Sequence, residues 1–211
     1  MLVAQRYIFL FFCSLLCVAI SSGTQAELLI KVTQGNDQPT IIAIPPITVD
    51  GLPINDDITA IVEADLSRSG LFRAIPRDDM LSYPTTVADV YYRDWRILGA
   101  EYLVIGSITS MEDSRYELTF SLINITAQKI QFTHKVRGKP TEIRDLAHTV
   151  SDKVYQSITG IPGAFSTRLA YVSAQRNSEN EDQQGAFVYR LHIADADGAR
   201  EQLMLKSSEP I

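Results

Sequence analysis

The 211-residue sequence predicts an α/β protein with a mixed sheet of five or six strands and three helices, followed by a segment made of strands alone. Three observations favour this class. Hydrophobic residues recur with helical spacing in three stretches. Strand-like runs, either alternating or continuously apolar, lie between those stretches. After Gly163 the helical spacing ends, and only strand-like runs remain.

Three strands are expected in the first part of the chain. Residues 28–33 and 40–44 have strand character, and the second run is ended by Pro45 and Pro46, which cannot donate to a central ladder. A third run covers residues 71–75 and stops at a proline. The strand at 28–33 is either an ordinary sheet strand or an edge that pairs with the backbone of another chain.

Helical spacing predicts three helices. Asp56 and Asp57 stand at the start of the first, where the helix dipole favours carboxylates, and Gly70 is its expected C-cap. The second extends from about Thr86 to Leu98, and the third follows a Pro-Thr pair and ends at Gly160. Their apolar faces consist of Ile58, Ile61, Val62 and Leu66 in the first, Val87, Val90, Tyr91, Trp95 and Leu98 in the second, and Ile143, Leu146, Ala147, Val150, Val154 and Ile158 in the third.

The remaining runs predict two groups of strands. The central group covers residues 102–105, a continuous apolar run typical of a buried strand, and residues 116–122 and 130–136, which alternate and predict an antiparallel pair with one wetter face. The C-terminal group is a meander with strands near 169–172, 187–193 and 201–205. A three-stranded meander of this size is marginally stable alone in water.

The first 26 residues have the features of a secretory signal peptide. Arg6 is the only charged residue before Glu27, the run from Tyr7 to Ile20 is almost purely apolar, and small polar residues follow up to Ala26. The apolar run is shorter than the ~20 residues that a membrane-spanning helix needs. We therefore expect export and cleavage after Ala26, with an uncleaved membrane anchor as the alternative.

Composition excludes several functional classes. The sequence is 45% hydrophobic and 21% charged, which is ordinary for a soluble globular protein. Its net charge of −6 argues against general nucleic-acid binding, because that needs Lys and Arg to replace counterions on phosphate. The two cysteines, Cys13 and Cys17, both lie in the predicted signal peptide, so a disulfide-stapled miniprotein is excluded.

No motif for catalysis, metal or cofactor binding is visible in the sequence. It has no phosphate-binding glycine loop and no nucleophile elbow, and its three histidines are scattered. His134 is expected to be a hydrogen-bonded core residue, and His148 is expected to form a solvated pair with Asp152 four residues along one helix. We therefore predict no catalytic residues, no metal ligands and no cofactor.

Three segments resemble the TolB family, the periplasmic component of the bacterial Tol–Pal system. They are residues 56–72, residues 95–106, and residues 147–172, of which the last is the longest and most specific. The resemblance covers nearly all of the chain after the signal peptide. It implies an N-terminal α/β domain at residues 27–163, followed at 164–211 by an incomplete β-propeller blade, the start of a six-bladed propeller.

The resemblance also implies a function. Members of this family are adaptors, not enzymes, that connect an inner-membrane Tol complex with a peptidoglycan-associated lipoprotein and support outer-membrane integrity and cell division. Their first mature residues bind the C-terminal domain of TolA. The corresponding residues here are Glu27, Leu28, Leu29, Ile30, Lys31 and Val32. The lipoprotein-binding face belongs to the propeller, so that partner is expected only if a propeller is supplied elsewhere.

The sequence shows no repeated propeller blades, which leaves a second hypothesis open. The chain is either a truncated gene product, a fragment, or a paralogue that keeps the N-terminal half of an adaptor. The alternative is a fragment of a propeller-containing periplasmic hydrolase or solute-binding protein. That alternative requires a nucleophile with a base and an orienting group, or a polar pocket, and the sequence displays neither.

Overall fold

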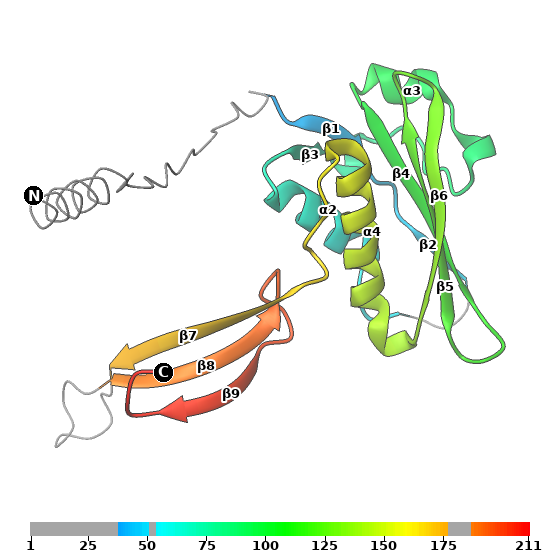
Figure 1. Ribbon diagram of the computed structural model, residues 1–211. Coiled ribbons are helices and arrows are strands. Elements are labelled where there is room, and N and C mark those ends of the chain that lie inside the picture. The colour runs from blue at the N-terminus through cyan, green and yellow to red at the C-terminus, as the bar shows by residue number, and fades with distance from the viewer. Residues whose placement is uncertain (1–37, 51–53, 177–186) are drawn as a thin grey trace, which may run out of the picture. The chain divides into compact units, whose positions relative to one another are not determined.

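The computed structural model describes residues 38–50, 54–176 and 187–211 (Figure 1). The predicted signal peptide, the strand expected at 28–33 and the expected TolA-binding residues 27–32 lie outside the described residues. Most of the polar loop that precedes β8 (Phe187–Asp195) also lies outside them. Within the described ranges, no helix is both long enough and apolar enough to cross a membrane.

The α/β domain contains a six-stranded mixed sheet, as the sequence predicted. The strand order is β3-β1-β4-β5-β6, and β2 pairs with β4 beside β1. β1 runs parallel to β3 and β4, whereas β4, β5 and β6 form antiparallel pairs. The strands are β1 Thr40–Ala43, β2 Thr48–Asp50, β3 Phe72–Ala74, β4 Tyr102–Ser110, β5 Tyr116–Asn124 and β6 Lys129–Gly138. The short strand β2 was not predicted, because the sequence there reads as a loop.

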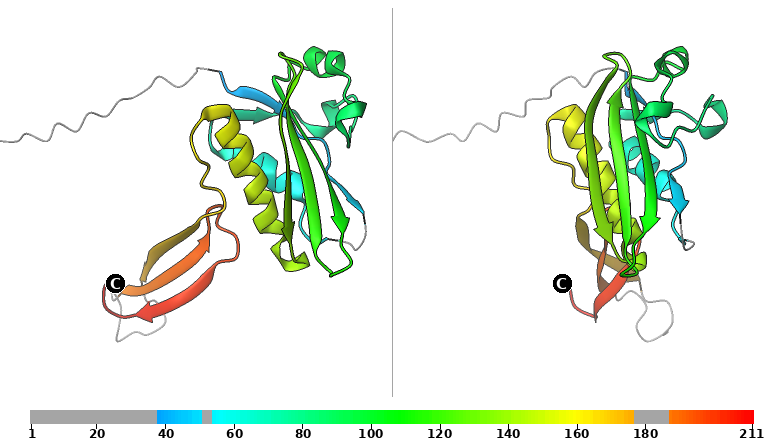
Figure 2. Two further views of the ribbon diagram at one scale, coloured as in Figure 1. Left: turned by 45° about the vertical axis from the view of Figure 1, so that its right-hand side comes forward. Right: turned by 90° about the vertical axis from the view of Figure 1, so that its right-hand side faces the viewer.

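α2 (Ile58–Arg68) begins and α4 (Ile143–Thr159) ends where the sequence predicted, but the C-cap of α2 is Ser69, and the expected cap Gly70 follows it with a φ of 74°. α2 is N-capped by Asp57, whose side-chain oxygen accepts a hydrogen bond from the Ala60 amide at 3.0 Å. α4 ends at Gly160, which has a φ of 77°, a left-handed conformation that glycine adopts without cost. Both helices pack against one face of the sheet, and α3 (Tyr92–Ile97) lies on the other side (Figure 2).

The prediction of one helix from Thr86 to Leu98 is wrong. The structure has a 3₁₀ turn at Val87–Asp89 and a separate α3, with Val90 in an extended conformation between them. Valine and tyrosine lose side-chain freedom in a helix, so this segment has little intrinsic preference for one continuous helix. The break buries Val90 and Trp95 but leaves Tyr91 exposed, although Tyr91 was expected on the apolar face.

The α/β domain has one hydrophobic core on each face of its sheet. The larger core lies between the sheet and the pair α2 and α4, and Tyr116, Leu118, Phe120 and Leu122 of β5 contribute to it. The smaller core lies under α3 and the 3₁₀ turns around the fully buried Trp95. His134 points to the larger-core side next to the ring of Phe132, but it is exposed, so the prediction of a core histidine is wrong.

The second sheet has three antiparallel strands in the order β7-β8-β9, the meander that the sequence predicted. Its strands are β7 (Arg168–Arg176), β8 and β9 (Gln202–Ser207). Large hydrophobic side chains on these strands are exposed, including Leu169, Leu203 and Met204. A three-stranded sheet with such exposed apolar side chains is consistent with the start of a propeller.

Candidate functional site

A network of charged side chains joins α4 to the turn between β8 and β9. Arg144 and His148 lie four residues apart on α4 and therefore share a helix face. The turn contributes Asp197 and Arg200, and Asp195 ends β8. Each of these residues takes part in a contact between the α/β domain and the second sheet.

His148 lies almost fully buried in this network. Its Nδ1 atom lies 2.7 Å from Oδ2 of Asp65 on α2, and the two residues are 1% and 0% exposed. The other oxygen of Asp65 accepts a hydrogen bond from Arg68 at 3.2 Å. The predicted solvated pair of His148 with Asp152 is therefore wrong. Asp152 instead accepts hydrogen bonds from the backbone N–H groups of Phe165 and Ser166.

Asp197 lies on the Nε2 side of the His148 ring and pairs with the guanidinium group of Arg144. Arg144 donates to Oδ2 of Asp197, and the same oxygen lies 3.8 Å from Nε2 of His148. Among the described residues, Nε2 of His148 and Nε of Arg144 have no hydrogen-bond partner although both atoms are buried. Nε of Arg144 lies 3.6 Å from Asp195, so its charge is nevertheless balanced.

Arg200 holds the turn in a strained conformation. Its φ is 50°, a left-handed value that a residue with a long side chain rarely adopts. In this conformation its guanidinium donates to Asp195 at 2.6 Å and also to Asp145 on α4. The hydrogen bond from Arg200 lowers the pKa of Asp145, against the opposing effect of burial. Two carboxylates thus keep the Arg200 backbone in place.

Asp65, His148 and Asp197 bring their ligand atoms within 4.8 Å of one another, close enough to hold a metal ion. The charges around them do not fit a divalent cation, however. Arg68 pairs with Asp65, and Arg144 pairs with Asp197, so guanidinium groups already take the carboxylate oxygens. The residues fit a network of ion pairs better than a metal centre.

A second cluster lies within the three-stranded sheet. Nε2 of His192 lies 3.1 Å from Oγ of Ser173, and its Nδ1 lies 2.5 Å from Glu201. The order of these groups is that of a hydrolytic triad, which the sequence did not suggest. A triad needs an aligned hydrogen bond from Nδ1 to the carboxylate, yet Nδ1 makes no such bond within the described residues. Glu201 also accepts a hydrogen bond from Tyr171, whose ring stacks on His192.

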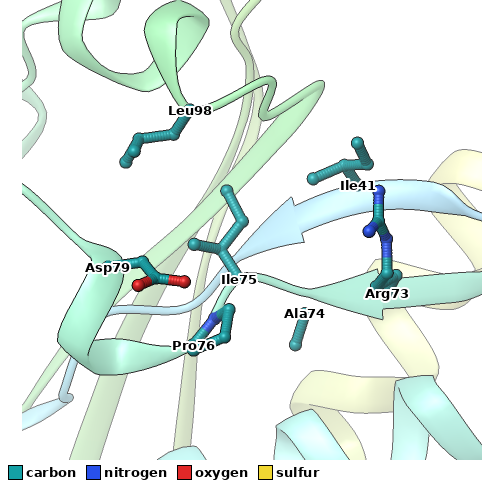
Figure 3. A pocket seen from close by; sticks show the side chains of 7 residues that line it. All are labelled: Ile41, Arg73, Ala74, Ile75, Pro76, Asp79 and Leu98. Carbon is teal, nitrogen blue, oxygen red and sulfur yellow. The ribbon is translucent and has the colours of Figure 1, made fainter.

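The α/β domain has a surface cavity of about 570 Å³ beside the edge strand β3. Its walls come from β1, β3, the 3₁₀ turn after β3 and the residue after α3. In Figure 3, Asp79 and Arg73 lie on opposite sides of Ile75, and Leu98 lies above them. The lining consists of Ile41, Arg73, Ala74, Ile75, Pro76, Asp79 and Leu98. Arg73 and Asp79 are the only charged residues in this lining, and the other residues are apolar. This combination does not form a catalytic site.

The fold and the site together define a two-part protein, an α/β domain tied by ion pairs to an antiparallel sheet. Residues 28–131 match the TolB amino-terminal domain family. The Tol-Pal system protein TolB of Marinomonas sp. is 45% identical over 197 residues, which are 92% of this chain and 44% of that protein. The TolB of Alcanivorax borkumensis is 43% identical over 190 residues, which are 90% of this chain and 42% of that protein.

A solved structure agrees with the sequence comparison. The crystal structure of TolB from Acinetobacter baumannii matches with a TM-score of 0.68 and 33% identity, covering 82% of this chain and 40% of that one. The chain belongs to the TolB family. It spans less than half the length of the curated relatives it matches.

Proposed function

We propose that this chain acts in the periplasm as an adaptor of the Tol–Pal envelope complex. The observation that carries the proposal is its similarity, over about nine-tenths of its length, to proteins named Tol-Pal system protein TolB. Outer-membrane integrity and cell division are the processes that this adaptor supports. The matched relatives are more than twice as long as this chain, and lipoprotein binding is proposed only together with a propeller.

The proposed contact with TolA is the segment from Glu27 to Val32. Its strand character supports the proposal, because an extended segment can add to the edge of a partner's sheet. Main-chain hydrogen bonds then provide affinity, and alternate side chains provide specificity. The position of the segment directly after the expected signal peptide also favours it.

The adaptor role is non-enzymatic. One observation among the described residues supports this. Ser173, His192 and Glu201 lie together, but the cluster lacks the hydrogen bond that would orient His192 as a catalytic base. The same geometry disfavours the alternative of a hydrolase fragment. The cavity beside β3 lacks the several convergent polar groups that a small-molecule site uses, which disfavours a solute-binding fragment.

Removing residues 27–33 tests the proposed contact. We expect the deletion to abolish binding to the C-terminal domain of TolA in calorimetric titration. Ile30→Pro should weaken TolA binding nearly as strongly, because proline removes an N–H group and restricts the backbone. Ile30→Val is the matched control, since valine retains strand propensity, and it should bind normally.

A thermal melt of each variant separates lost binding from lost folding. If the deletion variant melts normally and still binds TolA with unchanged affinity, the N-terminal segment is not the contact. The Tol–Pal proposal would then depend on the family similarity alone.

A further inference from the structure

We propose that the outer edge of β6 is a docking surface that binds an extended acidic segment of a partner protein as an added strand. In the strand order β3-β1-β4-β5-β6, β6 comes last, and among the described residues no strand pairs with its outer side (Figure 1). An edge strand of this kind presents a row of N–H and C=O groups that can pair with another backbone. The surface shares no residue with the proposed TolA contact at residues 27–32.

The two edges of the six-stranded sheet differ in how well they are protected against an added strand. The edge strand β3 is only three residues long, and Pro76 follows it closely, so it offers little backbone for pairing. β6 is ten residues long and contains no proline, so each of its residues keeps its N–H group. Its register with β5 shifts beside Gln131, and the pairing is regular from Phe132 to Gly138. The part of the edge at residues 132–138 is therefore suited to strand addition.

The charge along this edge is positive, although the whole chain has a net charge of −6. Residues 118–141 contain no Asp or Glu, and their cations are Lys129, Lys135, Arg137 and Lys139. The side chains of Lys135 and Arg137 are 61% and 54% exposed, and both pair with Glu117 of β5. Two cations that share one carboxylate retain a net positive charge, so this edge attracts an acidic segment.

The two faces of β6 differ in chemistry, and this difference defines the partner's sequence pattern. Phe132 and Val136 are half-buried and pack against the larger core. Lys135 and Arg137 lie on the opposite face, because side chains alternate along a strand. Residues opposite each other on neighbouring strands share a face and interact directly. A complementary strand therefore alternates acidic residues, placed beside Lys135 and Arg137, with apolar residues placed beside Phe132 and Val136.

The same charges argue against two other occupants of this edge. A second copy of the chain, paired through its own β6, would bring the two sets of Lys135 and Arg137 side chains together, and like charges on neighbouring strands are destabilising. Lysine on an edge strand thus prevents pairing between identical edges and still permits an acidic strand. An anionic membrane surface would neutralise the cations, but it would leave the backbone groups of the edge unpaired. An acidic strand satisfies both the charges and the backbone.

Binding of synthetic peptides to the full chain, followed by fluorescence anisotropy, tests the docking surface. The probe is a peptide of about nine residues, the length of a long strand, in which glutamate and valine alternate. The control peptide has the same composition, with all glutamates placed before the valines. We expect the alternating peptide to bind about tenfold more tightly, because only its glutamates can all lie on the basic face. Replacing its central valines by proline should abolish binding without changing its charge.

Two variants and hydrogen exchange assign the binding to β6. The double variant Lys135→Gln, Arg137→Gln should bind the alternating peptide about tenfold more weakly, since two cross-strand charge pairs are lost. Lys206→Gln is the matched control, because Lys206 is also an exposed lysine on an edge strand, and it should bind normally. In the unmodified chain, the peptide should increase the protection of amides 132–138 and leave that of β3 unchanged. A thermal melt confirms that each variant is folded.

Three results would overturn the proposal. Equal affinity for the alternating and control peptides would indicate a patch that binds anions in general. Peptide binding without a gain of protection at residues 132–138 would place the contact elsewhere. Self-association of the unmodified chain in sedimentation, with protection of the same amides, would identify a second copy as the occupant of the edge.

Discussion

Asp65 occupies a position on α2 where helical spacing alone would place a core side chain. Its side chain is fully buried, and its carboxylate oxygens are satisfied by His148 and Arg68. A buried carboxylate is tolerated only when charged or polar partners satisfy its oxygens. The contact between α2 and α4 therefore depends on a polar pair as well as on aliphatic packing.

Removing this carboxylate should destabilise the α/β domain strongly. We expect Asp65→Ala to lower the free energy of unfolding by about 3 kcal/mol, because it leaves the buried His148 without its partner. Urea unfolding measures this. Asp113→Ala, which breaks the exposed pair with Arg115, is the control and should change stability little. Equal effects of the two substitutions would mean that the buried pair contributes no more than a surface pair.

The role of His148 could not be predicted from the sequence because its partner is 83 residues away. Helical spacing compares a residue only with others on its own helix, and it therefore suggested Asp152. The charged residues of the β8–β9 turn are also distant from α4 in the sequence, so no local pattern links them to it. A polar residue at a core-facing position of α2, namely Asp65, is the one signal that could have indicated a buried network.

At the level of elements, prediction was most accurate where local chemistry and tertiary packing agree. Asp57 caps α2 and Gly160 ends α4 as expected, since capping depends on residues close in sequence. The break between Val87 and Tyr92 was missed because burial of Val90 and Trp95 decides it. β2 was missed because its pairing with β4 comes from tertiary structure, and its own residues are exposed.

The link from α4 to β7 depends on close approach of Gly163 to α4. A Cβ atom at Gly163 would lie 2.6 Å from Cα of Asp152. The side chain of Asp152 accepts hydrogen bonds from the backbone N–H groups of Phe165 and Ser166, which belong to this link. Gly163→Ala should therefore displace the link and lower the free energy of unfolding by about 2 kcal/mol, as overpacking does. Gly160→Ala is the control, since its Cβ meets open space and its φ of 77° adds only about 1 kcal/mol of strain.

Urea unfolding and the amide NMR shift of Phe165 distinguish these two glycine variants. The shift should move in Gly163→Ala and stay in place in Gly160→Ala. Equal losses of stability with no movement of the Phe165 signal would show that the link tolerates a side chain at residue 163.

At the level of the whole molecule, the two sheets differ in how well their apolar side chains are covered. In the α/β domain, many side chains on both faces of the sheet are fully buried, including Leu103, Val104 and Leu118. Few side chains of the three-stranded sheet are buried, and Ala194 is its one buried hydrophobic residue among those described. Propeller blades bury their faces against neighbouring blades, whereas among the described residues little of the apolar surface of this sheet is covered.

The three-stranded sheet should therefore open more easily than the α/β domain. We expect amides of β7–β9 to exchange at least about tenfold faster than those of β4 and β5, because local opening follows the amount of buried apolar surface. Limited proteolysis of the full chain should cut first between Arg176 and Gly185, where the sequence is polar. Cleavage there should leave a resistant fragment that contains the α/β domain. Equal exchange protection in the two sheets would contradict this expectation and would mean that the ion pairs between α4 and the β8–β9 turn stabilise the second sheet as effectively as neighbouring blades do in a propeller.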